Sequence, residues 1–189
     1  MSNDTKPIKV LGISGSLRKA SYNTMLLHNA VAMLPPGMSV EIFDLAAIPL
    51  YNEDVREKGF PAPVQQLRDK IAQSDALLIA TPEYNYSIPG VLKNAIDWAS
   101  RPPDQPFSGK PVAIMGVTPS TGRTIRSQLH LRQCFVFLNM HPVNKPEVLI
   151  SDAARIFDEQ GRLTDDTTRG FVRDLMAALA VWTRTVRGD

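Results

Sequence analysis

Short apolar segments alternate with helix-like segments along almost the whole chain of 189 residues. The short segments are rich in β-branched residues, as is typical of strands that are buried on both faces of a parallel sheet. The pattern predicts five strands, at residues 8–14, 39–45, 75–81, 111–117 and 144–150. It also predicts five helices, at residues 23–34, 63–73, 90–100, 124–138 and 165–186. We expect Thr164 to cap the last helix, with Asp165 and Asp166 favourable to its dipole.

Strands that alternate with helices build a parallel sheet with helices on both faces. Five such units predict an α/β fold, a flavodoxin-like three-layer sandwich with a five-stranded parallel sheet in the order 2-1-3-4-5. The length predicts a single domain over residues 1–189. Strands one and three are neighbours in this order, so we expect a crevice at their carboxyl ends. The loops at residues 15–22 and 82–89 would meet there.

Composition excludes several classes of function. The net charge is +2 and no basic run is present, which argues against a nucleic-acid partner. No apolar run approaches the roughly 18 residues that a membrane helix needs. The polar N-terminus lacks a signal-peptide core and Cys134 is the single cysteine, so a cytoplasmic protein is expected.

The loop after the first strand, GSLRKASYNT at residues 15–24, has the composition of an anion site. It opens a helix, whose first N–H groups attract negative charge. Arg18 adds a guanidinium suited to phosphate, and short polar side chains add donors, namely Ser16, Ser21, Asn23 and Thr24. This set suits a terminal monophosphate. The alternative is a plain helix cap by Ser21 or Asn23, with Arg18 solvated.

The loop after the third strand, PEYNYSIPG at residues 82–90, carries two tyrosines between two prolines. Pro82 and Pro89 stiffen its ends, and a stiff loop loses little entropy when it binds a rigid ligand. Tyr84 supplies a flat apolar surface, and the backbone around Asn85 could read the edge of a heterocycle. The alternative is that the tyrosines pack on their own helix or on a partner subunit. Beside a monophosphate site, a flat wall describes a site for flavin mononucleotide (FMN).

The chain resembles the NADPH-dependent FMN reductase family, in particular its bacterial quinone and chromate reductase branch. The segments that carry the resemblance are GSLRKASYN, PEYNYSIPGVLKNAIDWASRP, SGKPVAI, HLRQ and NKPE, at residues 15–23, 82–102, 108–114, 130–133 and 144–147. It implies a flavodoxin-like fold, noncovalent FMN and oligomers with flavin sites near subunit interfaces. It also implies phosphate ligands at Ser16, Arg18, Ser21 and Asn23, and flavin-ring contacts at Pro82, Glu83, Tyr84, Asn85 and Thr118.

The loop after the fourth strand departs from the pattern of that branch. Family members usually carry a serine at its start and a Gly-Gly pair ahead of the arginine that matches Arg126. This chain reads TPSTGRTIRSQ, with Thr118 at the start and Arg123 and Thr124 in place of the glycines. The departure bears on the backbone shape of the loop and on the Thr118 contact.

The expected function is an FMN-dependent NAD(P)H oxidoreductase that passes two electrons, by ping-pong hydride transfer, to a small acceptor such as a quinone, free flavin or chromate. Tyr84, Asn85 and Arg123 are the candidate substrate residues. The cofactor carries the chemistry, so neither an acid/base pair nor a metal is expected. The sequence leaves NADPH versus NADH open. A homodimer or homotetramer is expected.

The nearest rival is a flavodoxin-type FMN electron carrier without NAD(P)H turnover. Such carriers tend to be strongly acidic, and the charge of +2 argues against one. A response regulator would need an aspartate where Thr81 stands, and a small tyrosine phosphatase would need a cysteine in the first loop. His28, His130 and His141 lack the spacing of metal ligands.

Overall fold

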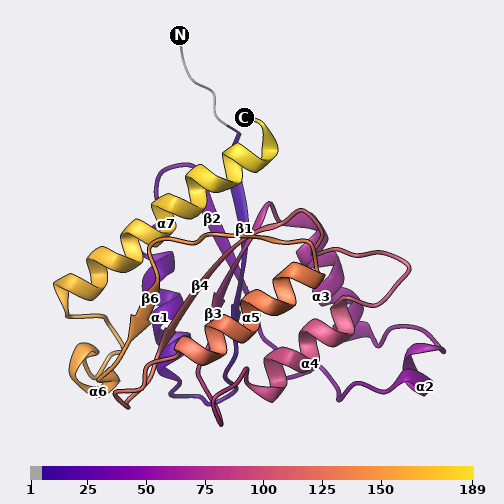
Figure 1. Ribbon diagram of the computed structural model, residues 1–189, viewed down its shortest axis with the longest axis horizontal. Helices are drawn as coiled ribbons and strands as arrows, with labels where there is room; N and C mark the ends of the chain where they lie inside the picture. The colour runs from indigo at the N-terminus through magenta and orange to yellow at the C-terminus, as the bar shows by residue number, and fades with distance from the viewer. Residues whose placement is uncertain (1–5) are drawn as a thin grey trace.

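A parallel sheet forms the centre of the protein, of which the computed structural model describes residues 6–189 (Figure 1). Its strands are β1 (Ile8–Ser14), β2 (Met38–Phe43), β3 (Ala76–Ala80), β4 (Pro111–Val117), β5 (His141–Pro142) and β6 (Val148–Ile150). Every neighbouring pair is parallel, and the order is β2-β1-β3-β4-β5, with β6 also paired to β4. The predicted flavodoxin-like order is therefore confirmed.

The last part of the sheet differs from the prediction. The single strand expected at residues 144–150 is wrong in extent, because β6 covers only Val148–Ile150 and β5 lies before the predicted segment. Both strands lie beside β4, which pairs with β5 at its start and with β6 at its end. A proline-containing loop, residues 143–147, separates the two pieces, and proline interrupts the pairing of a strand.

Helices cover both faces of the sheet. The long ones are α1 (Tyr22–Val31), α3 (Ala62–Gln73), α4 (Gly90–Ala99), α5 (Ile125–Phe137) and α7 (Asp166–Arg187). Two one-turn helices, α2 (Glu53–Arg56) and α6 (Ala153–Ile156), were not predicted. Side chains of α1 and α7 join one apolar core, whereas side chains of α3, α4 and α5 join the other. Figure 1 shows α7 apart from the pair α4 and α5. The structure is thus a three-layer sandwich.

Helix α7 shows why these segments fold as they do. Its buried residues Val172, Leu175, Met176 and Leu179 recur at helical spacing, which gives one apolar stripe against the sheet. The predicted N-cap at Thr164 is wrong. Asp165 is the cap, and its carboxylate accepts the N–H of Thr168 at 2.7 Å. Thr164 instead donates its hydroxyl to the carbonyl of Ile156, at 3.1 Å.

The carboxyl ends of β1, β3 and β4 lie level at one edge of the sheet. The N–H of Gly15, just after β1, donates to the carbonyl of Ala80 at 2.8 Å. In the same way, the N–H of Thr81, just after β3, donates to the carbonyl of Met115 at 2.9 Å. The loops that leave these strands therefore start side by side. Within residues 6–189, the structure holds no helix with the length and apolar character that crossing a membrane demands.

The cap of α7 should make the stability of the protein depend on pH. Hydrogen bonds from Thr168 lower the pKa of the Asp165 carboxyl below its ordinary value. A carboxylate with a depressed pKa stabilises the fold above its unfolded-state pKa, and this contribution is lost as the pH falls through the folded-state pKa. We expect Asp165→Ala to lower the melting temperature at pH 7 and to have a smaller effect at pH 3.

Thermal unfolding followed by circular dichroism at both pH values measures this. Asp166→Ala, in the first turn of the same helix, is the matched control and should have the weaker effect at pH 7. A larger effect of Thr164→Ala than of Asp165→Ala would contradict the assignment of the cap.

Candidate functional site

A cavity of about 260 Å³ opens where the loops after β1, β3 and β4 meet. Most residues predicted to bind the cofactor line it, namely Ser16, Arg18, Ser21, Asn23, Pro82, Glu83, Tyr84 and Thr118. Tyr22, Val117 and Pro119 line it as well and were not predicted. Thr24, Asn85 and Arg123 are not among its lining residues. Three segments that are far apart in the sequence thus meet at one edge of the sheet.

The first loop combines a helix cap with a free cationic group. Ser21 caps α1, because its hydroxyl accepts the N–H of Thr24 at 3.3 Å. The guanidinium of Arg18 donates to the carbonyl of Ala20 at 2.6 Å and lies 5.5 Å from the ring centre of Tyr22. Within residues 6–189 no carboxylate pairs with Arg18. Its positive charge is available to an anion in the cavity.

Asn23 connects the first loop to the end of β4. Its buried amide donates to the carbonyl of Val117 at 2.9 Å, and its side-chain oxygen accepts the N–H of Val117 at 3.0 Å. Both polar atoms of the side chain are therefore occupied within the protein. Its backbone N–H, in the first turn of α1, has no acceptor within the helix. Thr24 bonds through its hydroxyl to Ser14, at 2.8 Å, behind the cavity wall.

The second loop is a tight turn that presents its tyrosines to solvent. Tyr84 and Ser87 exchange two backbone hydrogen bonds, of 3.2 and 2.9 Å. The two central residues, Asn85 and Tyr86, both have positive φ angles, of 49° and 64°. This is the conformation of a type I′ turn, which asparagine adopts readily and tyrosine does not. Tyr84 remains 51% exposed and forms an open wall of the cavity.

The carboxylate of Glu83 locks the second loop to α5. It accepts the N–H groups of Arg126 and Ser127, at 2.9 and 3.2 Å, and the Arg126 guanidinium, at 2.9 Å. Thr124, which precedes α5, makes no capping bond with its side chain, so Glu83 caps this helix from another loop. Arg126 also lies 3.8 Å from the ring centre of Tyr86. The side chain of Glu83 therefore holds in place the loop that forms this wall of the cavity.

Glycines permit the close approach of these loops. A Cβ atom on Gly15 would lie 3.2 Å from Pro82 and 3.4 Å from Pro89, so the first and second loops touch at this point. A Cβ atom on Gly116 would lie 2.3 Å from the Thr124 hydroxyl and 2.5 Å from the carbonyl oxygen of Thr81. Gly116 thus makes room for Thr124, one of the two residues that replace the expected glycines.

The other replacement, Arg123, keeps the backbone shape of a glycine. Its φ angle is 56°, in the left-handed region that glycine adopts at little cost. Its side chain lines a second, larger cavity of about 690 Å³ on the far side of the loop, and not the cavity at Tyr84. Thr118 does line the first cavity, and its hydroxyl bonds to Ser120 at 3.1 Å.

Two other kinds of chemistry have no support in the described structure. Among residues 6–189, no group of three or more His, Cys, Asp or Glu side chains is placed to hold a metal ion. Cys134 is half-buried on α5, and burial raises the pKa of its thiol. A raised pKa suppresses the thiolate, which is the reactive form, so the surroundings of Cys134 do not activate it as a nucleophile.

Comparison with known proteins identifies the family. The NADPH-dependent FMN reductase family matches residues 8–155. This chain belongs to that family. It is 59% identical over 188 residues to an NAD(P)H-dependent FMN reductase of Pseudomonas aeruginosa, with 100% of both chains covered. It is 41% identical to a quinone reductase of Escherichia coli, with 97% of this chain and 99% of that one covered.

A solved structure supports the same family assignment. The flavoenzyme NAD(P)H:(acceptor) oxidoreductase FerB of Paracoccus denitrificans matches with a TM-score of 0.84 and 32% identity, and covers 94% of this chain and 98% of that chain. A more distant NADH:FMN oxidoreductase, at 17% identity and a TM-score of 0.72, shares the fold. The cavity at Tyr84 is therefore the candidate flavin site of this family member.

The side chain of Asn23, a predicted phosphate ligand, joins the loop after β1 to the end of β4. Asn23→Ala leaves the buried N–H and carbonyl of Val117 without partners, which should cost about 2 kcal/mol of unfolding free energy. Because Val117 and Thr118 would then shift, affinity for FMN and for riboflavin should fall together.

Urea denaturation and fluorescence titration measure the two effects. Asn144→Ala, at an exposed position, is the matched control and should change stability by less than about 0.5 kcal/mol. A stable Asn23→Ala protein that loses FMN affinity but keeps its riboflavin affinity would show that Asn23 acts on the phosphate alone.

Proposed function

We propose that this protein is an FMN-dependent NAD(P)H oxidoreductase, formed by residues 1–189 as one domain, that passes two electrons to a small acceptor. The acceptors that fit an open, flat site are quinones, free flavin and small oxidants such as chromate. One observation carries the proposal: the phosphate-type loop and the tyrosine loop line the same cavity, in a chain of the NADPH-dependent FMN reductase family. The quinone reductases among its relatives support the acceptor class.

The donor set of the cavity fits the phosphate end of FMN. Ser16, Ser21 and Arg18 lie at one side, next to the first turn of α1. No carboxylate in the described part of the chain pairs with the Arg18 guanidinium. A helix N-terminus offers N–H groups to a phosphate, and Asn23 contributes its backbone N–H there. Arg18 adds charge-assisted bonds, which are about twice as strong as neutral ones. These residues would hold the phosphate.

The other side of the cavity fits the flavin ring. Pro82, Glu83 and Tyr84 form one wall, and Thr118 lies on the loop after β4, which also lines the cavity. Bound FMN would accept a hydride from NAD(P)H and pass the electrons on to the acceptor. The protein positions the ring, supplies hydrogen-bond donors near its polar edge, and leaves space beside Tyr84 and Asn85 for a planar substrate. No side chain is needed as an acid or base.

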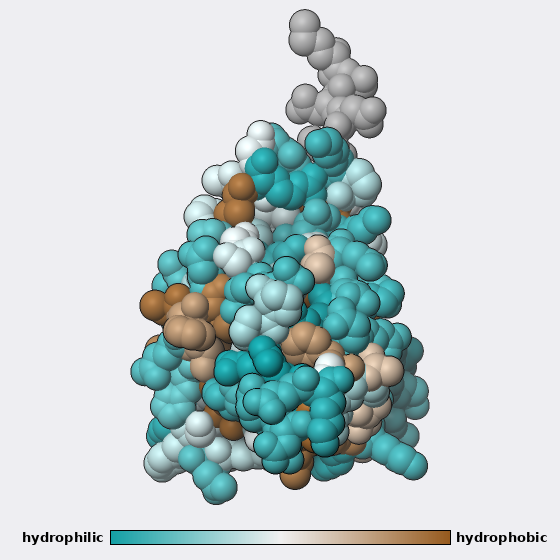
Figure 2. Space-filling model, turned by 90° about the vertical axis from the view of Figure 1, so that its right-hand side faces the viewer, coloured by the Kyte–Doolittle hydropathy of each residue, from teal (hydrophilic) through white to brown (hydrophobic). Residues whose placement is uncertain are grey.

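We also propose that a second copy of the chain completes the site. Helix α5 exposes Val136 and Phe137, at 83% and 82%, and Tyr86 is exposed in the turn that packs on the same helix. Figure 2 shows a group of apolar side chains at the left edge of one face, with smaller apolar areas scattered over the rest of a largely hydrophilic surface. A partner that covered the whole length of α5 would also reach Tyr86, in the same turn as Tyr84 of the open cavity wall. The assembly would be a homodimer or a homotetramer.

A cytoplasmic location is part of the proposal. The chain needs NAD(P)H, which the cytoplasm supplies, and its single cysteine, Cys134, is free. Free thiols persist in reducing compartments.

The phosphate assignment is tested through Arg18. Arg18→Ala should weaken FMN binding by about 1.5–3 kcal/mol, the worth of a hydrogen bond to a charged group. Riboflavin lacks the phosphate, so its affinity should hardly change. Fluorescence titration of the apoprotein with both ligands measures the difference. Lys19→Ala, which removes the neighbouring charge outside the cavity, is the control. Equal losses for FMN and riboflavin would overturn the assignment.

The reaction order is tested by kinetics. Donor and acceptor use the same open side of the cavity, at Tyr84, so they must bind in turn. Double-reciprocal plots against NAD(P)H at several quinone concentrations should be parallel, and NAD(P)H alone should bleach the flavin absorbance under anaerobic conditions. Intersecting plots would mean that both substrates bind together. A flavin that NAD(P)H cannot reduce would identify an electron carrier in place of a reductase.

The assembly is tested by light scattering over a dilution series. We expect a dimer or tetramer, and we expect the double change Val136→Ser and Phe137→Ser to produce smaller species with lower activity. Leu50→Ser changes an equally exposed apolar residue that lies outside the helices, and it should leave the assembly intact. A wild-type monomer with full activity at micromolar concentration would contradict the proposal.

A further inference from the structure

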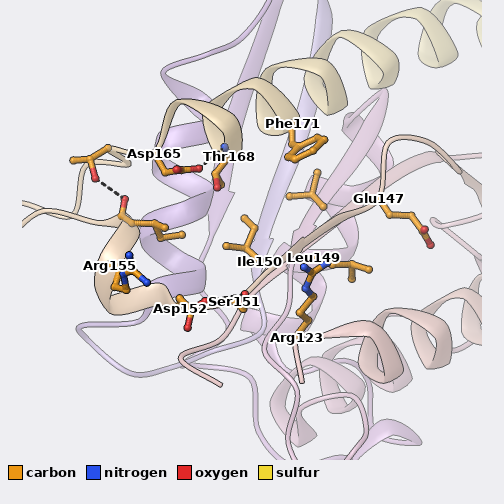
Figure 3. A pocket seen from close by; sticks show the side chains of 13 residues that line it. Arg123, Glu147, Leu149, Ile150, Ser151, Asp152, Arg155, Asp165, Thr168 and Phe171 are labelled. Atoms are coloured by element: carbon orange, nitrogen blue, oxygen red, sulfur yellow. Dashed lines mark hydrogen bonds between the residues drawn. The ribbon is translucent and has the colours of Figure 1, made fainter. Parts of the chain in front are cut away.

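The largest unexplained feature is the cavity of about 690 Å³ that lies next to the candidate flavin site (Figure 3). Its lining comes from the end of β6, from α6, from the start of α7 and from Arg123. The two cavities share a wall, because Thr118 lines the first, and its N–H donates to the carbonyl of Ile150, which lines the second, at 3.1 Å. A molecule that reaches over the Thr118 loop would occupy both.

Two arginines in this cavity have no acidic partner. Within residues 6–189, neither Arg123 nor Arg155 forms an ion pair, although three carboxylates line the same cavity. Each carboxylate has another partner: Asp165 caps α7, Asp152 accepts the hydroxyl of Ser151 within the cavity at 3.2 Å, and Glu147 pairs with Lys145 at 3.1 Å. The guanidinium groups are therefore free to bind phosphate groups.

The position of Arg123 adds a second observation. A non-glycine residue with positive φ is strained by about 1–3 kcal/mol, and such strain gathers at functional sites. Glycine would fit this backbone at lower cost, yet the chain carries a guanidinium at this point, directed into the cavity (Figure 3). A charge placed there at a cost in stability is consistent with a binding role.

The cavity also offers an aromatic surface. Phe171, on α7, is 50% exposed and lines the cavity. Figure 3 shows the side chains of Arg155 and Arg123 on opposite sides, with Ser151 and Asp152 between them and the ring of Phe171 above. An aromatic face beside two separated cationic groups suits a nucleotide that carries phosphates at two positions. The adenosine end of NADPH has this form, with a 2′-phosphate and a diphosphate on one ribose.

We propose that this cavity binds the adenosine end of NADPH, with Arg155 on the 2′-phosphate and Arg123 on the diphosphate, so that Arg155 makes the enzyme prefer NADPH over NADH. Arg123 stands on the loop that borders the flavin cavity, and the diphosphate is the part of the dinucleotide closer to the nicotinamide. Phe171 packs against the adenine. This inference rests on the proposed NAD(P)H oxidoreductase function.

Steady-state kinetics with both donors test the assignment. Arg155→Ala should raise the KM for NADPH by about tenfold and leave the KM for NADH and both kcat values unchanged, because the lost contact is made equally in the bound and reacting states. Arg123→Gly, which suits the left-handed backbone, should raise both KM values by a similar factor. Arg169→Ala, an exposed arginine on α7 outside the cavity, is the matched control and should change neither.

A binding measurement separates this inference from the proposed function. Calorimetric titration of the FMN-loaded protein with adenosine 2′,5′-bisphosphate should give binding that Arg155→Ala weakens and Arg169→Ala does not. An Arg155→Ala protein with an unchanged preference for NADPH, with equal losses for both donors, or with unchanged bisphosphate binding would overturn the assignment. A wild-type protein that binds the bisphosphate but does not oxidise NAD(P)H would overturn the reductase function. The assignment of the nucleotide site would then still hold.

Discussion

The carboxylate of Glu83 is the interaction on which the candidate site depends. It takes the place of a cap at the start of α5, where two N–H groups and the helix dipole both favour a negative charge. The ion pair with Arg126, at 2.9 Å, adds a third bond, and Arg126 in turn packs on Tyr86. One side chain therefore fixes the start of α5, the shape of the tyrosine turn and the wall of the cavity.

Asn23 and two glycines, Gly15 and Gly116, fix the position of the loops on the other side of the cavity. The amide of Asn23 holds the first turn of α1 against Val117, while Gly15 and Gly116 let the three loops approach to contact distance. The cavity is thus shaped by bonds within the protein. A wall organised before the ligand arrives loses little entropy on binding, which suits a rigid flavin ring. The same preorganisation leaves Arg18 and the first N–H groups of α1 available to the phosphate that we propose they bind.

Sequence reasoning was wrong about the cap of α7, where two neighbouring residues both suit the role. Thr164 and Asp165 both suit a helix cap, and only the path of the chain after α6 decides that Asp165 faces the Thr168 N–H. The substrate role predicted for Arg123 stays a prediction, and the structure places this residue in the lining of the larger cavity and not of the cavity at Tyr84. The sequence indicates the residue type at both positions, and tertiary contacts set the direction of the side chain.

Hydrophobic periodicity and turn residues act over short distances, so the sequence alone was enough to predict the alternation of strands and helices and the two loops that follow the first and third strands. The strand order was inferred from the fold class that this alternation favours, and the pairing of the strands in the structure confirms it. Motif spacing also indicated the phosphate-type loop and the flavin family. The tertiary structure decided the pairing of Glu83 with α5, the bond between Asn23 and Val117, and the second cavity beyond Thr118. The two bonds join residues more than 40 positions apart, and the second cavity forms between segments that only the folded chain brings together. A pattern in the linear sequence carries no signal for such contacts.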